Sequence, residues 1–210
     1  MKIRKQFLGR SIRGIVIYAV IMAALYGVLF FLFSSDGPSD PGPAFVVFLV
    51  FGAMFFLPLI IMLIRLLTGG YTRKFDRYTA TLGEAEKETF ERNCETGYRF
   101  NTAILAGDCV VINERGRLLA IPVKSIVWIY KQDVPLNAYS TRQLTIVTDD
   151  KKLTMLLTGK KHDSLELDEF IRRITLVKPG IFVGFDQITH TMFRSDFEEM
   201  KRLASGGYRS

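Results

Sequence analysis

Two long stretches without a charged residue constrain this chain more than any other feature. They span Gly14–Phe33 and Pro43–Ile64 and are 20 and 22 residues long. The hydrocarbon core of a bilayer is about 30 Å thick, and a helix needs about 20 apolar residues to cross it. The sequence therefore predicts two transmembrane helices within residues 1–70, joined by the polar segment Ser34–Gly42.

The first stretch follows a basic segment, as the apolar region of a secretory signal does. That apolar region is only about 7 to 15 residues long in a signal, however, and ends at a small-residue cleavage site. The stretch here is longer, and no convincing site of this kind follows it. We therefore expect an uncleaved helix, so that the two stretches form a membrane α-hairpin.

The charges that flank the hairpin predict its orientation. The first 13 residues carry five basic groups and no acid, and residues 65–77 carry four basic groups and one acid. The connecting segment contains only Asp36 and Asp40 as charged residues. Because basic flanks stay on the cytoplasmic side, we expect a multi-pass protein of the cell membrane with both termini in the cytoplasm.

Residues within the two stretches favour an anchor over a transport path. Ala23 with Gly27, and Gly52 with Ala53, are small residues that would allow close helix contact. Pro58 predicts a kink in the second helix. Neither stretch contains Asp, Glu, Lys, Arg or His, and such residues are what usually mark an ion or proton path through a membrane.

Composition shows a second domain at residues 71–210 and limits what it binds. A 49% hydrophobic share with 17 Phe excludes a disordered chain, and two cysteines exclude a disulfide scaffold. Residues 78–210 contain 19 basic and 18 acidic groups, so the basic character of the chain belongs to the membrane flanks. A nucleic-acid partner is not expected, because it requires a basic face on the folded domain.

Residues 71–210 predict an α+β domain. A helix is expected at 84–94, with Gly97 as its stop, and a hairpin turn is expected at Asn113–Gly116. The expected strands form a meander: 99–105, 108–112, 117–121, 124–131, 142–148 and 153–157. Alternation in the fourth strand is expected to place Ile126, Trp128 and Tyr130 on one face, opposite Val127 and Ile129.

Two further helices are predicted after the strands. Asp163 and Glu166 have the spacing of a capping box, and Lys178-Pro179-Gly180 would end the helix that they begin. Its apolar stripe consists of Leu167, Phe170, Ile171 and Ile174. A last helix is expected over 186–204, with an apolar face of Ile188, Met192, Phe193, Phe197 and Met200.

The run from Gly107 to Phe185 carries a resemblance to a known group of proteins. It contains GDCVVINERGRLLAIPVKSIVWIYKQ, then QLTIVTDDKKLTMLL, an amphipathic helix and a segment with IFVGFD. This pattern resembles the PH-like domains of uncharacterised bacterial membrane proteins in which a transmembrane hairpin precedes the domain. The resemblance implies a bent antiparallel sheet with a capping helix and carries no catalytic residues. The additional C-terminal helix beyond Phe185 departs from it.

No motif for catalysis, a metal or a cofactor stands out. His162, His190, Cys94 and Cys109 are the only histidines and cysteines, and they lack metal-ligand spacing. Cys109 is expected to be buried in a strand, whereas Cys94 near a helix end could be exposed. Adjacent His162-Asp163-Ser164 cannot form a catalytic triad. Two lysine pairs, Lys151-Lys152 and Lys160-Lys161, would lie about 25 to 30 Å apart at the ends of one strand.

These features together favour a non-enzymatic membrane protein that anchors a PH-like module at the inner leaflet, where the module binds a protein or a lipid. The alternative is an accessory subunit of a membrane transport or envelope complex. Anionic lipid headgroups are the expected contact of Arg73, Lys74 and Arg77, which follow the second apolar stretch. The simpler interpretation, which the sequence favours, is that these three charges only set the topology.

Overall fold

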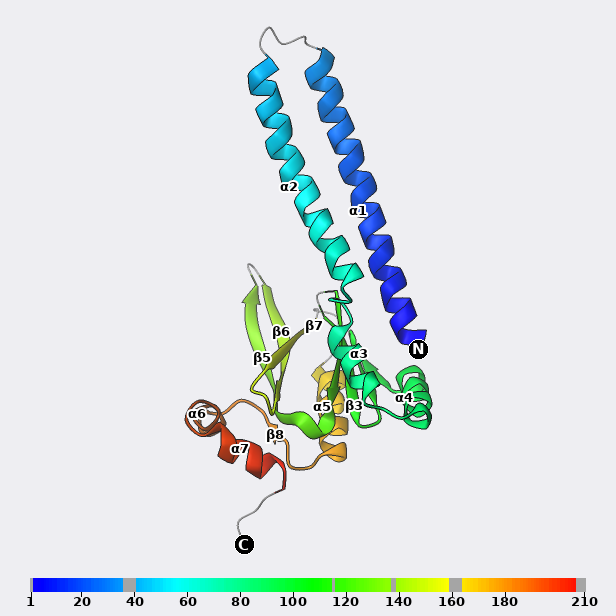
Figure 1. Ribbon diagram of the computed structural model, residues 1–210. Helices are drawn as coiled ribbons and strands as arrows, with labels where there is room; N and C mark the ends of the chain where they lie inside the picture. The colour runs from blue at the N-terminus through cyan, green and yellow to red at the C-terminus, as the bar shows by residue number, and fades with distance from the viewer. Residues whose placement is uncertain (1, 36–40, 115, 137–138, 159–163, 207–210) are drawn as a thin grey trace. The chain divides into compact units, whose positions relative to one another are not determined.

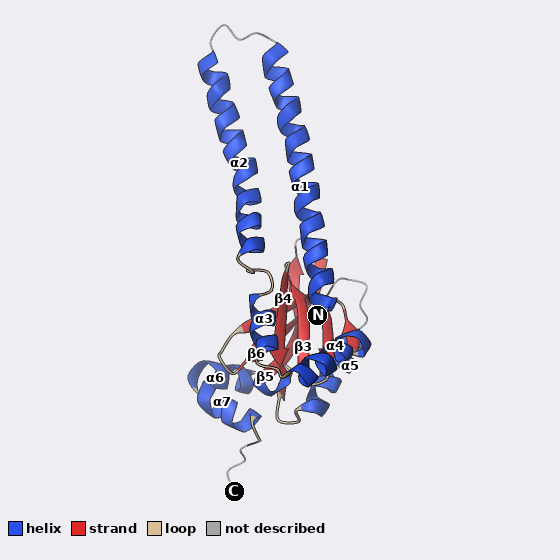
Figure 2. Ribbon diagram, turned by 45° about the vertical axis from the view of Figure 1, so that its right-hand side comes forward, coloured by secondary structure: helices blue, strands red, loops and turns tan. Residues whose placement is uncertain are grey.

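The computed structural model describes residues 2–35, 41–114, 116–136, 139–158 and 164–206. The chain divides into two compact units, Met1–Arg73 and Lys74–Ser210. The first unit is helical, and all strands of the described chain lie in the second (Figures 1 and 2).

The first unit is a pair of long helices, α1 (Lys2–Ser35) and α2 (Pro41–Leu67). The segments Lys2–Phe31 and Leu49–Leu67 each contain a stretch of 18 residues with a mean hydropathy of 2.4 and 2.5, respectively, and are long and apolar enough to cross a membrane. Pro58 lies inside α2, which continues through it. Gly69, with a φ of +65°, follows the end of α2, a conformation that glycine adopts without strain.

The contact between α1 and α2 uses aromatic residues more than the predicted small ones. A Cβ on Gly52 would lie 3.7 Å from the Tyr26 ring, and that ring meets Phe56 edge-on with 5.7 Å between centroids. Ala23 and Gly27 are exposed, and nothing lies within 4 Å of a Cβ placed on Gly27. The prediction that this pair forms the helix contact is therefore wrong, because the Tyr26 face of α1 meets α2 instead.

The second unit begins with helices α3 (Arg73–Ala80) and α4 (Glu84–Thr96), which precede a four-stranded antiparallel sheet. The strands of this first sheet follow one another in space as in sequence: β1 (Tyr98–Phe100), β2 (Ala103–Ala106), β3 (Cys109–Glu114) and β4 (Arg117–Pro122). Glu114 pairs with Arg117, so the predicted hairpin is confirmed, and Gly116 has a φ of +71°.

The expected single strand at 99–105 is wrong, because the chain reverses direction within it. Asn101 has a φ of +50°, and β1 pairs with β2 so that Phe100 lies opposite Ala103. Asn tolerates the left-handed conformation that such a tight turn needs. The apolar residues on both sides had masked this turn.

The second sheet has the strand order β7-β6-β5-β8. After the short 3₁₀ helix η1 (Val123–Ser125), β5 (Ile126–Leu136), β6 (Tyr139–Thr148) and β7 (Leu153–Thr158) form the expected antiparallel meander. The two residues of β8 (Phe182–Val183) pair with β5 in parallel. This parallel strand at the edge was not predicted.

A β-bulge changes which residues of β5 share a face. Ile126 pairs with Thr148 and Trp128 with Val147, so that Val127 is the extra residue. Ile126 and Ile129 therefore face the main core, whereas Val127, Trp128 and Tyr130 face the other side. The predicted alternation is wrong for this reason.

The main core lies between the two sheets and α5 (Ser164–Val177). The predicted stripe of α5 is confirmed, because all four residues are buried in this core with the strands. The core residues that the helix contributes are Leu167, Phe170, Ile171 and Ile174. Asp163, the predicted first residue of the capping box, lies outside the described residues, as do Lys160, Lys161 and His162.

A helix pair, α6 (Gln187–Ser195) and α7 (Phe197–Ala204), covers the second face of β5 and β6. The single helix expected over 186–204 is wrong, because the chain breaks at Asp196, with φ −144° and ψ 64°. The Asp196 side chain accepts a hydrogen bond from the Glu199 N–H and so begins α7. The second core here contains Trp128, Tyr130, Val147, Met200 and Ala204 with Met192, Phe193 and Phe197 packed against it.

Some apolar residues of the second unit do not reach a core. Ile188 is 77% exposed, so it does not belong to the buried face predicted for the last helix. On β7, Leu153 and Met155 are exposed, while Thr154 and Leu156 are buried. The side chains of Leu153 and Met155 therefore point away from the main core.

Candidate functional site

The short helix α3 carries a cationic outer face. Arg73, Lys74 and Arg77 are all exposed, and their spacing of i, i+1 and i+4 places them on one side of a helix. Phe75 and Thr79 lie on the opposite side and are buried. Helix α3 is therefore amphipathic. Its buried residues pack on the domain, and its three cations point to solvent.

Two aromatic contacts fix the inner face of α3. Phe75, with no exposed surface, packs against Phe90 of α4 with 6.0 Å between ring centroids. Tyr78 meets the same Phe90 ring edge-on at 5.4 Å. Tyr78 also lies beside Cys109 of β3, and burial, together with the neighbouring groups Cys109 and Asp108, raises the pKa of its phenol. These contacts fix the orientation of α3 on the domain.

The three cations of α3 are not neutralised by neighbours. Across the part of the chain that the structure describes, none of the side chains of Arg73, Lys74 and Arg77 forms a hydrogen bond or ion pair. Their positive charge therefore remains available to an anion from outside the domain.

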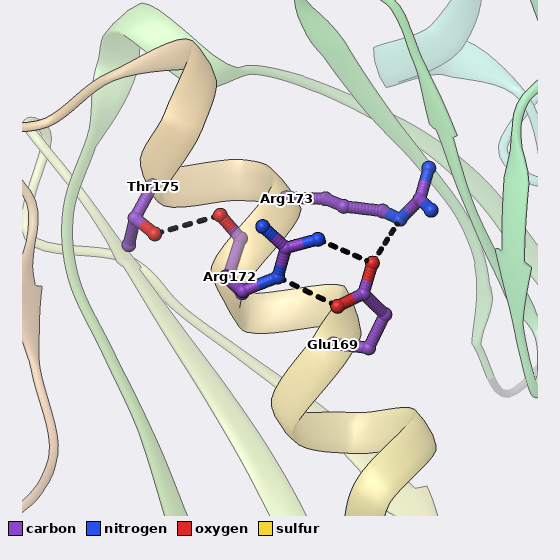
Figure 3. A network of polar contacts seen from close by, with 4 residues as sticks. All are labelled: Glu169, Arg172, Arg173 and Thr175. Atoms are coloured by element: carbon purple, nitrogen blue, oxygen red, sulfur yellow. Dashed lines mark hydrogen bonds and ion pairs between the residues drawn. The ribbon is translucent and has the colours of Figure 1, made fainter.

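Helix α5 shows the contrasting arrangement (Figure 3). Glu169 accepts hydrogen bonds from Arg172 Nε and Nη2 at 2.7 and 2.9 Å and from Arg173 Nε at 2.6 Å. These hydrogen bonds lower the pKa of Glu169 to about 2, so that it stays ionised. Part of the charge of the two arginines is therefore compensated within α5.

A groove lies between α3, α4 and the start of β3. Its volume is about 310 Å³. The lining residues are Tyr78, Leu82, Ala85, Glu86, Thr89, Phe90, Asn93 and Asp108. Half of these residues are aromatic or aliphatic, and the other half are polar. The polar half includes the carboxylates of Glu86 and Asp108, and no Lys or Arg lines the groove. No local sequence pattern indicates this groove, although the apolar residues at 75, 78 and 82 could have indicated the inner face of α3.

The lysine pair of the β6–β7 turn is engaged within the domain. The Lys151 ammonium lies 5.1 and 5.3 Å from the ring centroids of Phe193 and Phe197. Lys152 forms an ion pair with Asp150. These contacts make Lys151 part of the α6–α7 packing, so the pair is a weaker candidate for an external anion than the face of α3.

The cysteines and the described histidine do not form a reactive centre. Cys94, which the sequence suggested could be exposed, is buried. The side of α4 that carries it packs on the domain. Burial raises its pKa to about 12, and burial also raises the pKa of Cys109. His190 packs against the Phe185 ring at 5.4 Å. Among the described residues no group of three potential metal ligands occurs.

The architecture defines a class of protein with two long apolar helices followed by an α+β domain of two sheets and peripheral helices. Residues 69–193 match the domain of unknown function DUF6709, and the chain belongs to this family. The match includes the cationic face of α3, the groove and α6 up to Phe193. Neither a curated protein nor a solved structure gives a significant match.

Proposed function

We propose that the chain is a multi-pass membrane protein in which α1 and α2 anchor a PH-like binding module at the cytoplasmic leaflet. In this proposal the module binds a partner at the membrane surface and performs no catalysis. The cationic face of α3 contacts anionic lipid headgroups and so holds the start of the module at the bilayer. The single observation that carries the proposal is this exposed, uncompensated cationic face.

The position of α3 in the chain supports the proposal. Only five residues, 68–72, separate the end of α2 from the start of α3. A chain spans at most about 3.6 Å per residue, so this connection reaches no further than about 20 Å. Arg73, Lys74 and Arg77 therefore stay near the membrane surface if α2 crosses the bilayer.

The attraction of these three cations to an anionic leaflet is strong enough to hold α3 at the membrane surface. A Lys or Arg beside an anionic leaflet contributes about 1 kcal/mol, and the attraction falls off within a Debye length. Three such residues would contribute about 3 kcal/mol at low salt. Basic residues on the N-terminal side of α1 would add to the same surface, which also supports the cytoplasmic orientation of both termini.

The arrangement of sheets supports the PH-like assignment. Two sheets, antiparallel except for the β5–β8 pair, enclose the main core, and α5 completes it through its apolar stripe. The capping helix that the resemblance implies corresponds to α5, whereas the strands form two sheets in place of one bent antiparallel sheet. The α6–α7 pair is the addition, and it covers the outer face of the second sheet.

The proposal can be tested with the full-length protein in nanodiscs. A donor dye on an introduced cysteine at exposed Gln187 and acceptor dyes on lipid headgroups report the distance from the module to the bilayer. The native cysteines are buried and should not compete for the dye. With phosphatidylglycerol present, we expect a short distance that lengthens at high salt and in the variant R73Q/K74Q/R77Q.

The matched control removes three other exposed cations, R117Q/K124Q/R194Q. It changes the net charge by the same amount, and it should leave the distance unchanged. A distance that ignores both salt and the α3 substitutions would contradict lipid contact by α3. In that case the three charges would serve only to set the topology.

A further inference from the structure

The groove beside α3 combines features that suit a small organic cation. Tyr78, Leu82 and Phe90 provide an apolar and aromatic wall, and Phe90 is almost fully buried. Glu86 and Asp108 provide two carboxylates, and no basic side chain lines the groove. An ammonium group gains both from carboxylates and from the face of an aromatic ring.

Both carboxylates retain acceptor capacity. Glu86 Oε2 accepts a hydrogen bond from the Gly83 N–H at 2.7 Å, and a carboxylate has about four acceptor positions. The Asp108 side chain forms no hydrogen bond or ion pair within the described chain. An ammonium donor in the groove would therefore find acceptors that the protein itself does not use.

Two cations of α3 lie close in sequence to Tyr78, which lines the groove. Lys74 precedes Tyr78 by four residues and Arg77 precedes it by one, and all three belong to α3. Residues i and i+4 of a helix are neighbours on its surface, about 6 Å apart. Lys74 is therefore a surface neighbour of Tyr78, a lining residue of the groove that also contains the two carboxylates.

We infer that the groove and the adjoining edge of α3 bind the headgroup of a zwitterionic phospholipid with a primary amine, such as phosphatidylethanolamine. The ammonium enters the groove toward Glu86 and Asp108, and the phosphate contacts Lys74 and Arg77. A primary ammonium is favoured over choline because it donates hydrogen bonds to carboxylates, which a quaternary ammonium cannot do. The inference rests on the proposed function, which places α3 at the membrane surface.

The test uses native mass spectrometry of the full-length protein released from micelles with equal amounts of phosphatidylethanolamine, phosphatidylcholine and phosphatidylglycerol. We expect several-fold more retained phosphatidylethanolamine than phosphatidylcholine. The double variant E86Q/D108N should lose this preference and keep its phosphatidylglycerol. Gln at 86 can still accept from the Gly83 N–H, so that the start of α4 is preserved.

The matched control is E88Q/D149N, which neutralises one exposed Glu and one exposed Asp outside the groove. It should retain the lipid preference of the parent. Equal retention of the ethanolamine and choline lipids by the parent would overturn the inference. The inference would also be overturned if E86Q/D108N kept the same preference for the ethanolamine lipid as the control variant, with a far-ultraviolet circular dichroism spectrum that matches the parent.

The phosphatidylglycerol signal distinguishes the two proposals. If R73Q/K74Q/R77Q lowers phosphatidylglycerol retention while E86Q/D108N changes nothing, the groove inference fails and the lipid contact of α3 stands. If the groove variant lowers the ethanolamine lipid and the α3 variant leaves phosphatidylglycerol unchanged, the anionic-lipid proposal fails instead.

Discussion

At the scale of single residues, Gly97 shows how closely α4 approaches the first sheet. A Cβ at this position would lie 2.3 Å from the Leu105 carbonyl oxygen and 2.6 Å from that of Asn93. Both atoms belong to the backbone, so neither can move as the end of a flexible side chain would. Gly97 has an ordinary negative φ of −62°, and the requirement for glycine is therefore purely one of space.

We predict that Gly97→Ala lowers the free energy of unfolding by about 2 to 3 kcal/mol, as overpacking does. Urea unfolding of the full-length protein in micelles can be followed by fluorescence of Trp128, the single tryptophan, which is buried. Gly83→Ser is the control, because its Cβ meets only Glu86 Oε2 at 3.5 Å and Ser is a good N-cap. Equal midpoints for both variants would disprove the steric argument.

At the scale of elements, much of the second unit follows from sequence pattern. The apolar stripe of α5 was predictable from the helical spacing of its apolar residues. The hairpin of β3 and β4 was predictable from its turn residues. Three departures were not predictable, since tertiary packing decided them. The chain turns at Asn101 within a segment of strand-like pattern, Val127 forms a bulge, and Asp196 divides a continuous amphipathic pattern into two helices.

The site could be predicted only in part. The sequence indicated Arg73, Lys74 and Arg77 from their position after an apolar stretch, and the structure places them on one exposed face. The groove could not be predicted, because Asp108 reaches it from the turn between β2 and β3, about 20 residues after Glu86 in the chain. Such long-range neighbours leave no local signal in one sequence.

The break at Asp196 gives a prediction for α7. Asp196→Ala removes the hydrogen bond to the Glu199 N–H, which is 3.2 Å long, and should destabilise α7 by about 1 kcal/mol. Amide hydrogen exchange should then rise in Phe197–Ala204. Asp196→Ser keeps an acceptor and should change exchange only slightly; similar exchange in both variants would contradict the capping role.

At the scale of the whole molecule, the second unit has the properties of an independent domain. Its main core is enclosed by its own sheets and α5, and a chain of about 140 residues can bury such a core. We predict that residues 71–210 alone are soluble and folded. Little strand signal in circular dichroism, or a product that requires detergent, would contradict this prediction.

The proposed function requires a membrane hairpin that leaves both termini in the cytoplasm. Alkaline phosphatase is active only outside the cytoplasm, so fusions to it report which side of the membrane a position occupies. We predict an inactive reporter after Ser210 and an active reporter inserted near Gly37, with equal amounts of both fusion proteins. An active fusion at Ser210 would contradict the account, because the module would then face away from the cytoplasmic leaflet.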